Sequence, residues 1–144
     1  MTETSYLPDV NVLLALSDAD HTGYRRASKW FKGIGGSRFL LCSITESGFV
    51  RLAASPHVGK RPMYSAMALL RQLSGFPNCG YLPFKTPLLD IVAPFASRLH
   101  GYRQVTDALL LGLAIESNSV LVTLDRGVEA LAGSEYKAHL LTLQ

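Results

Sequence analysis

Short apolar runs of strand length alternate with segments of helical periodicity along the whole chain, and this alternation most restricts the fold. Strands are predicted at residues 5–10, 37–44, 80–84, 119–124 and 138–143. Apolar side chains at helical spacing predict helices at 10–17, 18–36, 45–55, 63–75, 104–119 and 125–133. Pro94 divides segment 87–101 into two short helices. This order predicts an α/β class protein, an α/β/α sandwich around a mainly parallel sheet of about four to five strands.

The composition indicates one compact domain. With 144 residues, 48% of them hydrophobic, the chain can bury a sizeable core, and we expect a single domain over residues 1–144. No apolar run reaches the roughly 18 residues of a spanning helix, and the N-terminus lacks signal-peptide features. A cytoplasmic protein with no membrane partner is therefore expected. Cys42 and Cys79 are far apart and lack metal-ligand spacing, so we expect free thiols.

Four acidic residues occupy unusual places in this pattern. Asp9 interrupts the apolar stretch SYLPDVNVLLAL at the end of the first predicted strand. Glu46 follows FLLCSIT, Asp107 opens the most apolar helix, and Asp125 follows SVLVTL. Ligands of parallel α/β sheets bind beyond the carboxyl ends of the strands. We therefore expect the four carboxylates to meet at one edge of the sheet.

Carboxylates gathered in one cleft call for a cation. They repel one another and lose hydration, so they take up protons unless a positive charge compensates them. Oxygen ligands without neighbouring His or Cys side chains favour Mg²⁺ or Mn²⁺ over zinc. Such ions orient and deprotonate a water and neutralise charge on a phosphate. The acids therefore indicate phosphodiester hydrolysis.

Each acid also has a purely structural interpretation. Asp9, Asp107 and Asp125 are each placed to cap a helix, a role worth about 1 kcal/mol. Glu46 can complete a capping box with Ser43, because SITE matches the S-x-x-E pattern. Four caps at successive strand-to-helix edges explain the pattern less simply than one cation site, but spacing alone leaves both interpretations open.

Four stretches of the sequence resemble the acidic motifs of a nuclease family. LPDVNVLLAL, TESGFVRLA, VTDALLLGLA and LVTLDRGVEAL follow the order and spacing of the motifs of PIN-domain ribonucleases, specifically of the VapC toxin branch. DHTGYRRASKWF is similar to the second helix of that branch. The resemblance covers nearly the whole chain. It implies a PIN-domain fold and an endoribonuclease that is the toxin of a type II toxin–antitoxin system.

The resemblance also implies roles for individual residues. The catalytic and metal-binding quartet that it implies is Asp9, Glu46, Asp107 and Asp125. The supporting polar groups that it implies are Asn11 and Thr123. It further implies an RNA substrate, a Mg²⁺ or Mn²⁺ cofactor, a cognate antitoxin partner and a homodimer. Thr123 is expected to hydrogen-bond a ligand carboxylate or metal-bound water, or else to be an ordinary β-branched strand residue. We expect Asn11 to orient Asp9 through a hydrogen bond.

Basic and apolar residues outside the motifs suggest binding surfaces. Arg103 and Arg126 flank the acids in sequence and are candidates to hold an RNA phosphate, and ion pairs that balance the acids are the alternative. The net charge of +3 modestly favours a polyanionic partner. His21 is expected to cap or pack a helix, whose N-cap is expected at Asp20 or Thr22. Large apolar residues at 18–36 and 63–75 are compatible with core packing and with a groove for an antitoxin segment.

Two other functions compete with the nuclease interpretation. Haloacid-dehalogenase-like phosphatases use an Asp at the end of the first strand as nucleophile, but their second Asp, the general acid, is replaced here by Asn11. The later acidic stretch VLVTLDRGVEALAG also lacks the lysine which that chemistry needs. The other rival is a non-catalytic RNA- or antitoxin-binding module with a vestigial site. The presence of all four acids argues against it.

Overall fold

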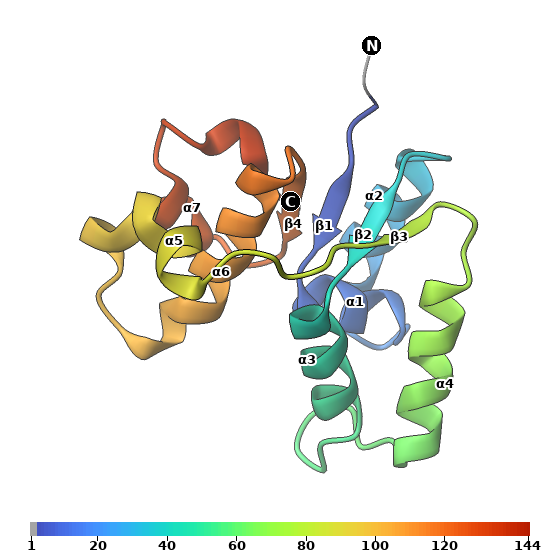
Figure 1. The fold of residues 1–144 in the computed structure, drawn as a ribbon. Helices are drawn as coiled ribbons and strands as arrows, with labels where there is room; N and C mark the ends of the chain where they lie inside the picture. Colours follow the sequence, from blue (N-terminus) through green and yellow to red (C-terminus); the bar gives the residue numbers. More distant parts are fainter. Residues whose placement is uncertain (1–2) are drawn as a thin grey trace.

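A single parallel sheet organises residues 3–144, which are the residues that the structure, a computed structural model, describes (Figure 1). The strands are β1 (Tyr6–Pro8), β2 (Phe39–Leu41), β3 (Cys79–Tyr81), β4 (Val120–Thr123) and β5 (Leu140–Thr142). They lie in the order β3-β2-β1-β4-β5, and every neighbouring pair is parallel. The winding reverses between β1 and β4, and such a switch point leaves a crevice at the carboxyl ends of these two strands.

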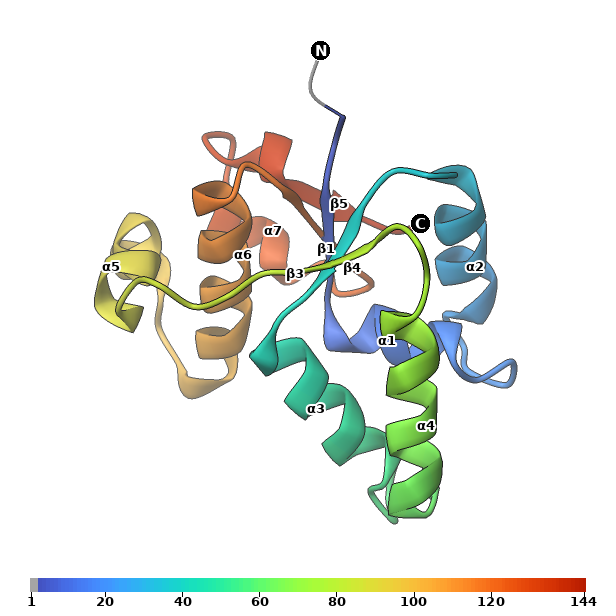
Figure 2. The ribbon, with the colours of Figure 1, turned by 45° about the vertical axis from the view of Figure 1, so that its right-hand side comes forward.

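Helices cover both faces of the sheet. They are α1 (Val10–Leu16), α2 (Tyr24–Gly33), α3 (Ser43–Ala53), α4 (Met63–Ser74), α5 (Leu88–Val92), α6 (Val105–Glu116) and α7 (Val128–Ala132), with short 3₁₀ helices at Ala93–Arg98, Tyr102–Gln104 and Lys137–His139. Figures 1 and 2 show α1 to α4 on one side of the sheet and α5 to α7 on the other. The predicted α/β/α sandwich and its five-stranded parallel sheet are thereby confirmed.

Alternating strand residues divide the core into two layers. Leu7, Leu40 and Leu121 pack with α5, α6 and α7, whereas Phe39 and Val122 pack with α1 to α4. Successive side chains of a strand point to opposite faces, so a run that is apolar throughout is buried on both. This double burial explains why the predicted strands contain few polar residues.

The order of the predicted strands and helices is confirmed, but the helix predicted at 18–36 is confined to Tyr24–Gly33, and the 3₁₀ helices at Tyr102–Gln104 and Lys137–His139 were not predicted. Segment 87–101 forms α5 and then a 3₁₀ helix at Ala93–Arg98, so the predicted break near Pro94 is confirmed. The N-cap of α2 is Gly23, so the prediction of Asp20 or Thr22 is wrong. The side chain that binds the backbone just before α2 is His21, whose Nδ1 accepts a hydrogen bond of 2.9 Å from the Gly23 N–H.

Close packing of α1 against α3 brings the end of β1 beside α3. A Cβ on Gly48 would lie 2.7 Å from Val10 Cγ2, closer than side-chain atoms pack. The glycine therefore lets α3 approach the residue that follows Asp9. Within residues 3–144, no helix has the length and apolar character needed to cross a membrane.

Candidate functional site

Asp9 lies at the switch point, and both of its carboxylate oxygens are held. It follows β1 directly, and only 7% of its surface is exposed. Oδ1 accepts a hydrogen bond of 2.7 Å from the Val10 N–H, so Asp9 is the N-cap of α1. Oδ2 accepts a bond of 3.1 Å from the Thr123 hydroxyl. The capping interpretation of Asp9 is thus correct, and the cap also fixes a carboxylate at the mouth of the sheet.

Thr123 ties the ends of β1 and β4 together. Its buried hydroxyl donates to Asp9 and accepts from the Asp125 N–H at 3.1 Å and from the Asn11 amide at 3.4 Å. One donor and two acceptor sites are all that a hydroxyl has, so its hydrogen must point at Asp9. The predicted bond from Thr123 to a carboxylate is therefore present.

Asn11 hydrogen-bonds residues at the end of β4 and not Asp9. Its amide nitrogen donates to Thr123, and its Oδ1 accepts a bond of 3.3 Å from the Leu124 N–H. The predicted direct bond between Asn11 and Asp9 is replaced by this two-step link. Both polar ends of the amide are used to hold the segment that carries Asp125.

Asp107 and Asp125 approach Asp9 without capping helices. The N-cap of α6 is Gln104 and that of α7 is Gly127, so the capping interpretation of these two acids is wrong. Asp107 lies in the first turn of α6, as predicted. Asp125 is exposed, and its Oδ1 accepts a bond of 2.8 Å from the Gly127 N–H in a tight turn.

Burial and neighbouring negative charge disfavour the ionised forms of Asp9 and Asp107. Desolvation, together with the negative charges of Asp9 and Asp125, raises the pKa of Asp107 from 3.8 to about 6. Burial raises the pKa of Asp9, although hydrogen bonds from Val10 and Thr123 work in the opposite direction. Like charges in a partly dry site produce this pattern, and a nearby cation reverses it.

Glu46 is not among the charges that shift the pKa of Asp9 or Asp107. It is in the first turn of α3, where Cys42 is the N-cap and Thr45 completes the capping box, so the predicted box between Ser43 and Glu46 is wrong. Its negative charge helps to raise the pKa of Cys79, on edge strand β3, after the larger effect of burial. Neither Asp9 nor Asp107 shows a comparable influence from Glu46.

The donor set suits a hydrated hard cation better than a cage of direct ligands. Among residues 3–144, no three His, Cys, Asp or Glu side chains form a group close enough to hold a metal ion. Mg²⁺ commonly keeps several waters and binds one or two carboxylates directly. Asp9, Asp107 and Asp125 offer oxygen donors only, which is the ligand chemistry that such an ion prefers.

The two predicted phosphate-binding arginines make other contacts. The Arg103 guanidinium donates to the Tyr102 hydroxyl at 3.2 Å and lies over its ring. Arg126 donates to the Gln144 side chain at 2.7 Å. The alternative of ion pairs with the acids is not found, because the only ion pair among residues 3–144 joins Arg98 and Glu135. Their predicted contact with RNA stays a prediction.

A groove of about 490 Å³ leads from Asp9 along α3 to the start of α6. It is lined by Asp9, Val10, Ser43, Ile44, Ser47, Gly48, Arg51, Leu52 and Thr106. Arg51 is the residue that the sequence interpretation missed. Ser43, Ser47 and Arg51 recur every four residues along α3, and this spacing places them on one helix face.

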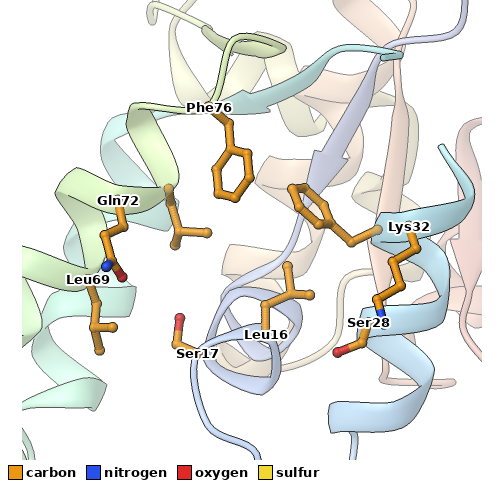
Figure 3. A pocket seen from close by; sticks show the side chains of 9 residues that line it. Leu16, Ser17, Ser28, Lys32, Leu69, Gln72 and Phe76 are labelled. Atoms are coloured by element: carbon orange, nitrogen blue, oxygen red, sulfur yellow. The ribbon is translucent and has the colours of Figure 1, made fainter. Parts of the chain in front are cut away.

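A second groove, of about 330 Å³, lies between α2 and α4 over the end of α1 (Figure 3). Its lining is mostly apolar and consists of Leu16, Ser17, Ser28, Phe31, Lys32, Leu69, Gln72, Leu73 and Phe76. Figure 3 shows Leu16 and Phe76 pointing into this space from opposite ends. It contains no acidic residue and is separate from the groove at Asp9.

Comparison with known proteins gives concordant results. The family model described as PIN domain matches residues 6–134. Ribonuclease VapC44 of Mycobacterium tuberculosis is 37% identical over 140 residues, covering 95% of this chain and 98% of its own. Ribonuclease VapC38 of the same species is 36% identical over 144 residues, with the same coverage.

Solved structures share the fold. The crystal structure of VapBC2 from Rickettsia felis, bound to a DNA fragment from their promoter, matches with a TM-score of 0.64 at 12% identity. The match covers 98% of this chain and 100% of that one. A domain of a functionally unknown protein from Methanocaldococcus jannaschii matches with a TM-score of 0.53 at 19% identity, covering 98% and 91%. At these identities the two structures support the fold alone.

Proposed function

The chain belongs to the PIN-domain family and to its VapC ribonuclease branch, and from this premise we propose that it is a toxin endoribonuclease that hydrolyses RNA phosphodiester bonds at a Mg²⁺ or Mn²⁺ site. Asp9, Asp107 and Asp125 would hold the ion. The observation that carries the proposal is the raised pKa of Asp107, about 6, which results first from burial and then from the negative charges of Asp9 and Asp125. Acids whose charges act on one another in a partly buried site are best explained by a hydrated cation among them.

Each residue of the site has a defined task in the proposed reaction. Thr123 keeps one Asp9 oxygen aimed at the crevice, and Asn11 holds Thr123 in place. When bound, the ion supplies Lewis-acid chemistry that activates a water and neutralises charge on the phosphate. Glu46 stays the predicted fourth acid, and its place on α3 favours a contact with RNA or water over direct contact with the ion.

Metal-dependent cleavage tests the proposal. Purified protein, free of any partner, is incubated with total RNA and Mg²⁺, Mn²⁺ or EDTA, beside Asp9→Asn and the exposed control Asp90→Asn. We expect cleavage with metal by the wild type and the control, and none with EDTA or by Asp9→Asn. RNA that stays intact under all conditions, with no metal binding by calorimetry, would overturn the proposal. RNA binding without cleavage would favour the non-catalytic module.

The phosphatase alternative is weakened by the contacts of Asn11. Both ends of its amide bind the end of β4, through Thr123 and Leu124, so the side chain is not available to exchange protons with a substrate. A labelled phosphate that became covalently attached to Asp9 would favour the phosphatase.

We also propose that a cognate antitoxin binds the groove between α2 and α4. The groove is mostly apolar, and Leu69 of α4 is only partly buried within it. An amphipathic segment of a partner would fill such a groove. Added antitoxin should inhibit cleavage by the wild type, and Leu69→Asp should relieve the inhibition. The control Leu89→Asp, at an equally apolar but exposed position on α5, should stay inhibited.

A homodimer is the remaining proposal from the family. Helix α4 exposes Met63, Tyr64 and Met67, with 58%, 79% and 45% of their surfaces accessible. Large apolar side chains gathered on one helix commonly mark an interface. Sedimentation of the wild type beside Tyr64→Asp tests it, since a dimer held by this face should dissociate in the variant.

A further inference from the structure

A basic residue shares the groove that leads from Asp9. Arg51 lies on the last turns of α3 and lines the groove together with Ser43 and Ser47. From Ser43 to Arg51 the helix advances about 12 Å, so this face extends well beyond the acids. Along α3 the groove thus combines the apolar side chains of Ile44 and Leu52 with two hydroxyls and one guanidinium, and it is acidic at its start.

The Arg51 guanidinium is not used in holding the fold. Among residues 3–144 it makes no hydrogen bond to protein, and the one ion pair within 4.0 Å joins Arg98 and Glu135. The hydroxyls of Ser47 and Thr106, which line the same groove, also lack protein partners in the described part of the chain. Donors that face one groove without protein partners suit a ligand rich in oxygen acceptors.

Arg51 also does not neutralise the acids. A cation kept only to balance Asp9 would pair with it directly, as an ion pair does across a few ångströms. Here the two opposite charges line one groove without pairing. A ligand that spans from one to the other is therefore anionic beside Arg51 and carries its reacting group beside Asp9.

We propose that Arg51, with the hydroxyls of Ser47 and Thr106, binds a phosphate of the RNA strand next to the phosphate that is cleaved. This inference rests on the proposed nuclease function and adds the path of its substrate along α3. The cleaved phosphate lies at the aspartates, and a guanidinium more than 4.0 Å from their oxygens meets the neighbouring phosphate instead. Arginine binds such a group through two parallel hydrogen bonds.

Binding without metal tests the phosphate site separately from catalysis. A fluorescent oligoribonucleotide of about 12 nucleotides and random sequence is titrated in EDTA, across about 50 to 200 mM salt. Arg51→Gln should weaken binding about tenfold and reduce the slope of log affinity against log salt by about 0.7. Arg51→Lys should keep the slope but only part of the affinity. The control Arg71→Gln changes an exposed arginine on α4 and should bind the oligoribonucleotide as the wild type does.

The outcomes distinguish the site from the enzyme. An Arg51→Gln variant that binds like the wild type, in affinity and in slope, would overturn the phosphate site even if the wild type cleaves RNA. Equal competition by a polyglutamate peptide would assign the groove to an acidic protein segment and overturn it as well. Failure of the wild type to cleave any RNA, with the Arg51 effect present, would instead overturn the proposed nuclease.

Kinetics test where the phosphate lies along the strand. A neighbouring phosphate is bound equally in the ground state and the transition state, so Arg51→Gln should raise KM about tenfold and leave kcat nearly unchanged. A fall in kcat at constant KM would place Arg51 on the cleaved phosphate and overturn the assignment to its neighbour.

Discussion

The two sides of the carboxyl edge of the sheet hold their polar residues differently. At the ends of β1 and β4, Asp9, Thr123 and Asn11 form a closed set of hydrogen bonds, and Asp9 is almost fully buried. On α3, which follows β2, Glu46 and Arg51 make no side-chain hydrogen bond within residues 3–144. The first region, the ends of β1 and β4 with Asp9, Asn11, Thr123 and Asp125, is held by hydrogen bonds before any ligand binds, and we call it the rigid region. The second region, on α3, presents charges without hydrogen-bond partners to solvent.

This difference separates chemistry from substrate binding. A metal ion needs ligands that are held in one geometry, and supporting hydrogen bonds supply that rigidity. A flexible RNA strand is held well by long side chains that can adjust to its phosphates. We therefore expect substitutions at the β1 and β4 ends to affect turnover most, and those on α3 to affect RNA affinity.

The sharpest test of this comparison pairs one acid from each region. Asp125→Asn should reduce cleavage by at least about 100-fold, because a metal ligand matters no less than its supporting partners, which cost up to about that factor. Glu46→Gln should stay within about tenfold of the wild type. Initial rates with one RNA at saturating Mg²⁺ measure both. Equal losses would show that Glu46 belongs to the rigid region after all.

Removal of the Thr123 hydroxyl should remove the hydrogen bonds that hold the rigid region together. Thr123→Val keeps the shape but removes the donor to Asp9 and the acceptor of the Asp125 N–H. We expect cleavage to fall about 10- to 100-fold and the free energy of unfolding to fall by about 1–3 kcal/mol.

The matched control for that variant keeps the hydroxyl. Thr123→Ser retains all three hydrogen bonds and loses one methyl group, so it should cleave nearly as the wild type does. Urea unfolding and cleavage rates are measured on both variants. If Thr123→Ser were as impaired as Thr123→Val, packing of the methyl group would be the cause, and the hydrogen bonds would not be.

The sequence predicted the strand ends at which Asp9 and Asp125 lie, because the signals for these ends are local. A buried strand that ends in an acid is visible in SYLPD and in SVLVTLD, and the parallel sheet brings such ends together. The partners within the region were less predictable. Which atom Asn11 binds depends on the distance between β1 and β4, and no periodicity encodes that distance.

The α3 region was harder to predict because orientation around a helix decides it. Glu46 and Arg51 lie five residues apart in one motif, yet only Arg51 lines the groove with Asp9. A helix turns about 100° per residue, so a small error in its start exchanges one face for another. The sequence showed the acid, and the packing of α1 on α3 at Gly48 determined which side chains meet it.

That packing can be tested with a small substitution. In Gly48→Ala the new methyl group would lie 2.7 Å from Val10 Cγ2 and force α1 and α3 apart. Overpacking of this kind costs about 1–3 kcal/mol, partly offset by about 1 kcal/mol of improved helix propensity. Gly33→Ala in α2, where the same atom meets open space, should be neutral or stabilising. Urea unfolding of both proteins checks the opposite signs.

The smallest expected effect concerns the stability of the metal-free protein against pH. The pKa of Asp107 is about 6 in the folded chain and 3.8 ordinarily, because burial and the charges of Asp9 and Asp125 disfavour its ionised form. Between these two values the unfolded chain releases a proton that the folded chain keeps, so stability falls as pH rises. Below this range the group is neutral in both states and contributes nothing.

Asp107→Asn removes the titrating charge and isolates this effect. In EDTA, the variant should be more stable than the wild type at pH 7.5, and the difference should vanish near pH 4. The difference should be modest because Asp107 is only partly buried. Added Mg²⁺ should reverse the order at pH 7.5, since only the wild type has the third carboxylate for the ion. If the two proteins differed in stability by the same amount at both pH values, the ionisation of Asp107 would not be what lowers the stability of the wild type.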